Sequence, residues 1–293
     1  MLINALKVVE IFCELDDFCR VYEEKLAVHL LPTAAASKHS VHLPCLALSE
    51  MMTIELLYHR SGHKCFQYYY EQEVRGGSLR SYFPQAPSYN RFVELKPRLL
   101  MALICYLHCL RLGTFLGIYY GDSTALSVCH NRRICQHRVF ARQARRGKTS
   151  VGWFYGFKLF LVVGAMGELV RAFVAPGNVA DGSQATIERL FKGLKGLAFT
   201  DKGFLNQKAF EALFEGGLKL VTALRRNMKN KLVSMKEKLL LKKRGMIEAV
   251  IDILKSVCDL EHTRHRSPVN WLVNTYAALC AYTTLERKPS IFR

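Results

Sequence analysis

The chain has 293 residues, half of them hydrophobic, and carries a formal net charge of +18. This length suits one or two domains, and the apolar content excludes a mostly disordered chain. The positive charge is clustered, which is typical of a protein that meets a polyanion, so we expect nucleic acid as the partner.

The sequence pattern of residues 1–111 predicts a helical region. Ser49 is placed to cap a helix that runs to Arg60, and Ser88 is placed to cap a second helix. A tyrosine-rich segment, residues 68–70, lies between them. This region fits either a helix-turn-helix-like DNA-binding module or a helical bundle that reads no DNA.

The most apolar window, Leu99 to Tyr120, is long enough to span a bilayer but contains His108 and Arg111. We therefore predict a buried helix followed by a buried strand, and no membrane contact. Acidic residues near the N-terminus do not fit a signal peptide. The ten cysteines form no CxxC pair and are scattered among apolar residues, which suits reduced, buried thiols, so we expect a reducing compartment such as the cytoplasm.

From residue 112 the pattern changes to alternating strands and helices. An apolar strand is followed by a strand pair that forms a hairpin, and then by helices and strands in turn. The predicted strands are Leu112–Gly121, Phe154–Val163, Glu168–Ala175, Leu197–Thr200 and Leu218–Leu224; the helices are Asp181 (as cap) to Lys192, 206–216 and 243–258. This order predicts an α/β fold with an RNase H-like mixed sheet flanked by helices. We expect two domains, a helical region at 1–111 and a catalytic domain at 112–293.

Three isolated acids stand out in the second half of the chain. Asp122 is predicted to end the first strand, Asp201 a short strand, and Glu248 lies on the last helix. Taken singly, Asp122 suits either a turn cap or a bound cation, and Glu248 suits a surface salt bridge. Together, three carboxylates suit two Mg²⁺ or Mn²⁺ ions about 4 Å apart, the arrangement that phosphodiester chemistry uses.

Several blocks of the chain form a recognisable series: Tyr119–Thr124, Cys129–Arg133, Gly152–Leu159, Pro176–Asp181, Asp201–Phe204 and Arg244–Glu248 with Lys255. They resemble successive motifs of the bacterial DDE insertion-sequence transposases, and three further blocks match one branch of that family, Leu48–Thr53, Ser88–Phe92 and His262–Pro268. Together they cover nearly the whole chain. Two departures are Gly121, where a bulkier apolar residue is usual, and Gly245, which falls inside the predicted catalytic helix.

The resemblance implies a catalytic core in which Asp122, Asp201 and Glu248 form a metal triad that holds two ions. It implies a bacterial, cytoplasmic enzyme that cuts the terminal inverted repeats of its element and directs a 3′-hydroxyl onto target DNA. Bringing two DNA ends together implies a homodimer on double-stranded DNA.

Two basic runs are expected to flank these acids and to contact DNA phosphates. Residues 131–152 hold seven Lys or Arg and no acid, and residues 224–244 hold nine against one acid. Such contacts position DNA without reading its sequence, and the alternative is a solvated loop. The predicted contacts are Arg132, Arg133, Arg145, Arg146, Lys148, Lys202, Arg225, Arg226, Arg244 and Lys255.

Other interpretations remain at this stage. A non-enzymatic DNA-binding regulator would use the same basic runs but leaves the isolated acids without a role, and an inactive transposase copy would keep them. A nuclease that cuts without joining would need the same triad. His130 is either a DNA contact or a structural histidine. A zinc site with Cys129, Cys135 and His137 has a spacing unlike that of common zinc modules.

Overall fold

The computed structural model describes residues 4–29, 46–113, 117–150, 152–222, 234–261 and 265–292. They belong to two compact units. The first comprises Met1–Leu110, Val257–Leu260 and Ser267–Tyr282; the second comprises Arg111–Ser256, Glu261–Arg266 and Thr283–Arg293. The sequence predicted one domain over 112–293, whereas most of the last helix groups with the N-terminal helices. In the first unit, Asn270 of that helix donates to the Val93 carbonyl.

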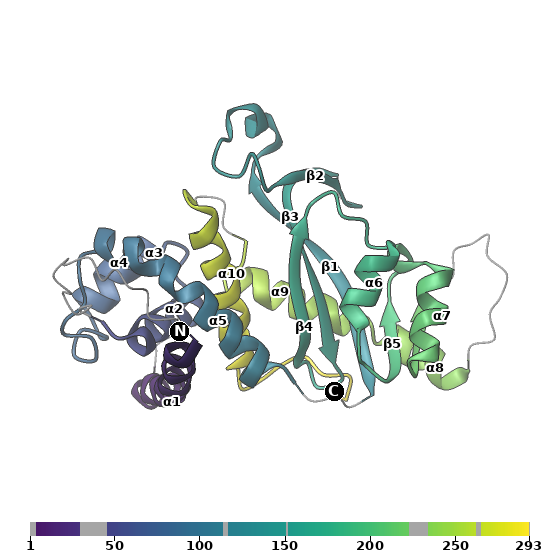
Figure 1. Ribbon diagram of the computed structural model, residues 1–293, viewed down its shortest axis with the longest axis horizontal. Helices are drawn as coiled ribbons and strands as arrows, with labels where there is room; N and C mark the ends of the chain where they lie inside the picture. Colours follow the sequence, from purple (N-terminus) through teal and green to yellow (C-terminus); the bar gives the residue numbers. More distant parts are fainter. Residues whose placement is uncertain are drawn as a thin grey trace. The chain divides into compact units, whose positions relative to one another are not determined.

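In the described residues of the first unit, all regular elements are helices (Figure 1). Its elements are α1 (Ala5–His29), α2 (Leu48–Ser61), α3 (Phe66–Tyr69), the π-helix η1 (Tyr70–Arg75), α4 (Tyr89–Leu95), η2 (Lys96–Arg98), α5 (Leu99–Tyr106), η3 (Leu107–Arg111) and α10 (Pro268–Thr283). The cap expected at Ser88 is confirmed, since its Oγ accepts the Arg91 N–H. The cap expected at Ser49 is wrong: α2 begins one residue earlier, and Ser49 donates to Asp16 at 2.9 Å.

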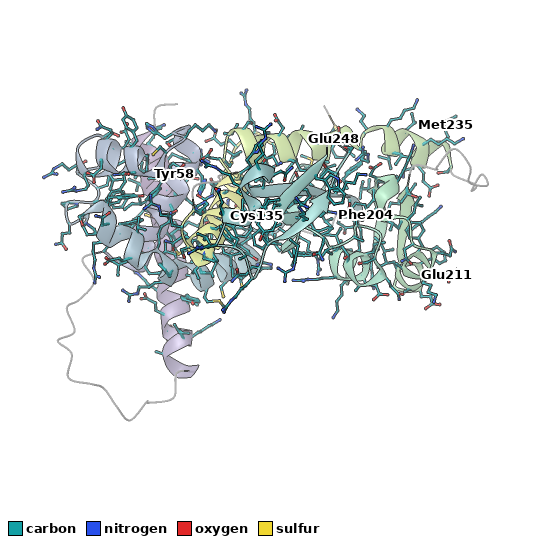
Figure 2. All side chains as sticks on the ribbon, turned by 90° about the horizontal axis from the view of Figure 1, so that it is seen from above. Tyr58, Cys135, Phe204, Glu211, Met235 and Glu248 are labelled. Carbon is teal, nitrogen blue, oxygen red and sulfur yellow. The ribbon has the colours of Figure 1, made fainter. Side chains whose placement is uncertain are left out.

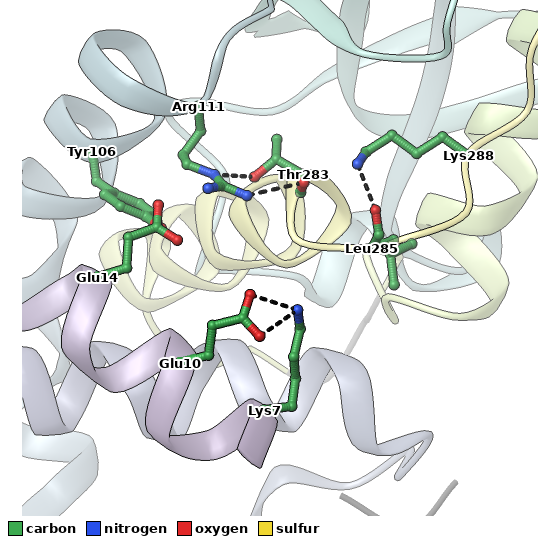
Figure 3. A network of polar contacts seen from close by, with 8 residues as sticks. All are labelled: Lys7, Glu10, Glu14, Tyr106, Arg111, Thr283, Leu285 and Lys288. Carbon is green, nitrogen blue, oxygen red and sulfur yellow. Dashed lines mark hydrogen bonds and ion pairs between the residues drawn. The ribbon is translucent and has the colours of Figure 1, made fainter. Parts of the chain in front are cut away.

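An aromatic cluster forms part of the core of this unit. Tyr69 and Tyr70 of the tyrosine-rich segment are fully buried, and their rings lie near those of Phe66 and Phe92. Burial of large aromatic surface is a main source of stability in a small helical unit. On α1, Glu14 accepts a hydrogen bond from the Tyr106 hydroxyl at 2.9 Å (Figure 3).

The apolar window of residues 99–120 contains a helix followed by the start of a strand, as predicted. Among the described helices, none combines the length and apolar character needed to cross a membrane. Arg111 donates from its guanidinium to the hydroxyl and the carbonyl of Thr283, each at 3.0 Å (Figure 3). An arginine that is hydrogen-bonded within the second unit accounts for the charge in this window.

The second unit is built on a six-stranded mixed sheet (Figure 1). Its strands are β1 (Ile118–Cys129), β2 (Arg145–Lys148), β3 (Trp153–Gly164), β4 (Leu169–Pro176), β5 (Gly196–Thr200) and β6 (Leu218–Thr222). The order is β2-β3-β1-β5-β6, and β4 also pairs with β3. β1 is antiparallel to β3 and parallel to β5, which is parallel to β6. The predicted β3–β4 hairpin is confirmed.

Helices cover both faces of this sheet. α6 (Gln184–Phe191) and α7 (Gln207–Glu215) contribute to a buried apolar cluster with Tyr119 and Phe160. α8 (Met235–Lys242) and α9 (Gly245–Ser256) lie against the other face, where the Tyr120 hydroxyl donates to the Leu240 carbonyl. Figure 2 shows Glu248 and Met235 on one side of the sheet and Glu211 of α7 on the other. The sheet therefore forms the middle of three layers.

Three boundaries differ from the predictions. β1 was predicted to end at Gly121 but runs on to Cys129, so Asp122 lies within the strand rather than at its end. α6 is capped by Ser183, whose Oγ accepts the Thr186 N–H, and not by Asp181. Part of the predicted 131–152 loop is the edge strand β2. β2 was missed because Arg-Arg-Gly-Lys has none of the β-branched or aromatic residues that mark strands.

Candidate active site

The first two acids are brought together by strand register. β1 and β5 run parallel, and their pairing ends with Gly121 opposite Thr200. Asp122 and Asp201 are the residues that follow this last pair, so they lie side by side where the β1–β5 pairing ends. β1 continues past this point while β5 stops, and the Ser123 N–H is free to donate to the Asp122 carboxylate at 2.7 Å. Asp201 is exposed.

Gly121 has a steric reason to be glycine. A Cβ at this position would lie 2.5 Å from Cζ of Phe191 and 3.0 Å from Cγ2 of Thr200. The α6 ring thus fills the volume that a larger residue on β1 would need. The departure from the family pattern is matched by a neighbouring side chain, and the strand next to Asp122 is well packed.

Glu248, the third acid, lies on α9 and is connected to Asp122 by Arg244. Arg244 donates to Asp122 Oδ2 at 3.3 Å and to Glu248 Oε1 at 2.7 Å, so one guanidinium bridges two carboxylates. The predicted four-residue spacing of Arg244 and Glu248 on one helix face is confirmed. Glu248 remains largely exposed, at 59% for its side chain. The apolar face of α9 holds it on the sheet, with Ile247, Val250 and Leu254 buried.

Lys255 occupies a different position from Arg244. Its ammonium donates to the Ala125 carbonyl of β1 at 2.9 Å and pairs with Glu261 at 2.9 Å. Glu261 in turn accepts the Ser127 N–H. Lys255 therefore fastens α9 to the part of β1 that has no β5 neighbour.

The electrostatics single out Asp122. Burial raises the pKa of this carboxyl to about 6, because desolvation disfavours its charged form. The hydrogen bond from Ser123 and the charge of Arg244 oppose the rise, whereas the charges of Asp201 and Asp181 add to it. Mutual repulsion among acids at one edge of the sheet is relieved by a bound cation.

Sequence reasoning missed a support behind this edge. Lys158 of β3 is buried, and its ammonium donates to Asp181 at 2.9 Å. Asp181 also accepts the Ser123 hydroxyl at 3.0 Å. Alternation along β1 directs Ser123 to the sheet face opposite Asp122. The Lys158–Asp181 ion pair therefore fixes Ser123, the residue that follows Asp122. The sequence signal for this contact was Lys158 itself, the one charged residue in the apolar run of β3.

The predicted DNA contacts fall in separate places. Arg132 and Arg133 lie in η4 (Asn131–Gln136), and Arg145, Arg146 and Lys148 lie in β2, all exposed. These cations gather at the far end of β1, roughly 20 Å from Asp122 by strand rise, rather than beside the acids. Exposed Lys202 follows Asp201 directly. Arg225 and Arg226 lie outside the described residues.

No group of three His, Cys, Asp or Glu side chains within the described ranges is gathered closely enough to hold a metal ion. Among the three candidate acids, Asp122 and Glu248 are held on either side of the Arg244 guanidinium. At the histidines, His130 Nδ1 accepts the Arg132 N–H at 3.4 Å and starts η4. The nine cysteines in the described residues are free thiols.

A family model described as "Transposase DDE domain" matches residues 112–268. Among solved structures, a cryo-EM structure of a piggyBac transposase synaptic complex with hairpin DNA is similar, with 11% sequence identity and a TM-score of 0.44. The alignment covers 94% of this chain and 71% of that chain. A likeness at this level carries no argument about function. No curated protein matches the sequence.

Proposed function

Because the match over residues 112–268 spans more than half of the chain, this protein belongs to the DDE transposase domain family, and we propose that it transposes DNA. The proposed reaction cleaves the terminal inverted repeats of an insertion sequence and joins the 3′-hydroxyl ends to target DNA. The proposed catalytic residues are Asp122, Asp201 and Glu248.

One observation carries this assignment. Asp122 and Asp201 leave the β1–β5 pairing in register, and Arg244 links Asp122 to Glu248 from the opposite helix layer. Asp122 and Asp201 thus lie side by side where the β1–β5 pairing ends, and Glu248 shares the Arg244 guanidinium with Asp122. Ligands of open α/β sheets bind beyond the carboxyl ends of strands, and Asp201 follows the carboxyl end of β5.

The residues fit divalent metal ions by their chemistry. Three carboxylates supply hard oxygen donors, and two of them already share one positive charge through the Arg244 guanidinium. Asp122, Asp201 and Glu248 would hold the ions, with Arg244 giving up one of its carboxylate partners. When bound, two Mg²⁺ or Mn²⁺ ions would activate the attacking oxygen and stabilise charge on the leaving oxygen.

The other residues of the site act by holding DNA and the acids in place. The Ser123 N–H orients the Asp122 carboxylate, and the Lys158–Asp181 pair fixes Ser123 from behind. A released Arg244 arm and exposed Lys202 are suited to hold the phosphates on either side of the cut. Lys255 keeps α9 against β1, which sets the height of Glu248 above the sheet.

Further parts of the proposal concern fold type and setting. The strands β4, β3, β1, β5 and β6 are neighbours in that order, and β3 alone runs in the opposite direction to the other four. This arrangement supports an RNase H-like sheet. We place the helical N-terminal region, residues 1–111, and the basic residues of η4 and β2 on DNA. A homodimer on double-stranded element ends in a bacterial cytoplasm completes the hypothesis.

The test is metal-dependent cleavage of a labelled duplex that carries the element end. Wild-type protein should nick or join it with Mg²⁺ or Mn²⁺ and not with EDTA. Asp201→Ala should lower the rate roughly 10³-fold, since a metal-held charge is worth several kcal/mol in the transition state. Asp252→Ala, which removes an exposed acid from α9, is the matched control and should keep the wild-type rate.

Two results would overturn the proposal. Equal rates for Asp201→Ala and wild type would remove Asp201 from the chemistry. Salt-sensitive DNA binding without cutting under either metal would favour a regulator or an inactive copy. Appearance of joined products, rather than nicks alone, separates a transposase from a nuclease.

A further inference from the structure

Trp153 is an exposed aromatic residue in an unusual setting. It is the first residue of β3 and 61% exposed, whereas Trp271, the other tryptophan of the chain, is 3% exposed. Exposed apolar side chains are common singly on protein surfaces, so exposure alone indicates nothing. The neighbours of the Trp153 ring are what distinguish it.

One cation lies over the indole, and further exposed cations lie on the neighbouring elements β2 and η4. Lys148 is its register partner on β2, and the ammonium of that lysine lies 5.6 Å from the ring centroid. Arg145 and Arg146 of β2 and the arginines of η4 are exposed. The Asn131 side-chain amide donates to the Trp153 carbonyl at 2.6 Å, which ties η4 to the start of β3. Residues 131–152 contain no acid, so the local potential is strongly positive.

Strand geometry relates this ring to the acids. Leu161 pairs with Asp122, and Trp153 precedes Leu161 by eight residues on the same strand. An even spacing along a strand places both side chains on one face, so Trp153 lies on the face that carries Asp122. At about 3.3 Å per residue, the two positions are roughly 26 Å apart.

We propose that Trp153 is a stacking platform for an unpaired base of single-stranded DNA whose phosphates the surrounding cations hold. This inference rests on the proposed function for the identity of the ligand as DNA. Lys148 approaches the ring, while its remaining exposed surface is open to a flat partner. Bases inside a duplex already stack on each other, so an unpaired base fits this ring and a paired base does not.

The distance between Trp153 and Asp122 indicates where along the DNA strand the stacked base would lie. At the duplex rise of about 3.4 Å per nucleotide, roughly 26 Å corresponds to at most about eight nucleotides between the base on Trp153 and the phosphate at Asp122, and to fewer if the unpaired strand is extended. A strand that has left its duplex near the cut could follow this face of the sheet. The platform would then hold the separated strand away from the acids.

Tryptophan fluorescence provides a direct test. The full chain is titrated with an oligothymidylate of about twelve nucleotides and, separately, with the matching blunt duplex. Trp153→Phe reports the signal of buried Trp271 alone. Stacking should quench the Trp153 signal with the single strand and leave it nearly unchanged with the duplex.

Affinity gives the second measurement. Trp153→Ala should weaken single-strand binding roughly 5- to 100-fold and change duplex binding little, since stacking contributes about that much per base. Arg146→Ala is the matched control from the same surface and should weaken both ligands alike. Equal quenching by both ligands, or unchanged single-strand affinity in Trp153→Ala, would overturn the proposal.

Cleavage separates this inference from the proposed function. If Trp153→Ala loses single-strand affinity while Asp201→Ala alone abolishes cutting, both stand. If quenching by the single strand is specific but no variant shows metal-dependent cutting, the platform stands and the transposition chemistry fails. If cutting depends on Asp201 and quenching is absent, the platform fails alone.

Discussion

Two carboxylate–cation pairs, one in each unit, show different uses of buried charge. In the helical unit, Glu55 is fully buried and pairs with Lys96 at 3.0 Å, and that ammonium lies 4.0 Å from the centroid of the Phe66 ring. In the sheet unit, Asp122 pairs with Arg244 at 3.3 Å, with side chains 19% and 23% exposed. The first pair is sealed by apolar groups, and the second lies at an open edge.

Burial raises the pKa of both carboxyls, so a perturbed pKa does not distinguish the two places. Their neighbours do. Glu55 has a cation of its own, whereas Asp122 shares Arg244 with Glu248 and feels the charge of Asp201. In a closed pair each acid has its own cation, so the fold depends on neither partner being removed alone. An open site with more acid than cation is prepared to bind further positive charge.

The largest effect on stability is expected at the closed pair. Lys96→Ala leaves Glu55 buried without its cation and should lower the free energy of unfolding by about 3–5 kcal/mol at pH 8. Thermal melting measures it. The double variant Glu55→Leu with Lys96→Met removes both charges and should melt near the wild type. A loss below about 1 kcal/mol in Lys96→Ala would show that Glu55 does not need the lysine.

The open site should behave in the opposite way. The raised pKa of Asp122 means that the folded protein holds this carboxyl's proton up to about pH 6, while the unfolded chain releases it near its ordinary value. Ionised Asp122 therefore destabilises the fold above pH 6, and the cost fades as pH falls toward 4. Asp122→Asn should raise stability by up to about 3 kcal/mol at pH 8 and by little at pH 4.

Melting curves of Asp122→Asn and wild type at both pH values, with EDTA present, test this sign. The same variant should lose metal-dependent cleavage. Greater stability with lost activity would mark Asp122 as an acid kept for function. Destabilisation at pH 8 would instead show that the Asp122–Arg244 pair holds the fold, as the Glu55–Lys96 pair does.

Local sequence patterns predict part of this fold. The β3–β4 hairpin, β5 and α7 follow from local apolar patterns and turn residues, and the structure has them. β1 was misplaced because its apolar start reads as a strand while Ser123, Thr124 and Ser127 read as a loop. Those residues form a strand through pairing with β3, which is distant in sequence and leaves no local mark.

The site divides in the same manner. Isolation and family resemblance singled out three acids, and helix periodicity predicted that Arg244 meets Glu248. The supporting contact of Lys158 with Asp181 joins residues 23 positions apart across the sheet. Pattern alone assigned Asp181 to a helix cap, because a cap and an ion-pair partner require the same residue type. Only the three-dimensional packing of β3 against the loop before α6 distinguishes them.

The smallest effect is expected at Gly245, one of the two glycines that depart from the family pattern. Gly245 begins α9 instead of lying inside it, and a Cβ there would meet no atom within 4 Å. Gly245→Ala should therefore raise stability by about 0.4–1 kcal/mol by restricting the unfolded chain. Cleavage should stay at the wild-type rate, because the substitution alters no contact of Arg244 or Glu248.

Gly121→Ala is the matched contrast, since its Cβ would collide with Phe191 and Thr200 beside Asp122. It should cost about 1–3 kcal/mol by overpacking and slow cleavage by moving Asp122 out of register with Asp201. Melting temperatures and cleavage rates of the two variants give opposite signs if the departures are structural adaptations. A gain of activity in either variant over the wild type would instead identify that glycine as a lesion in a decayed copy.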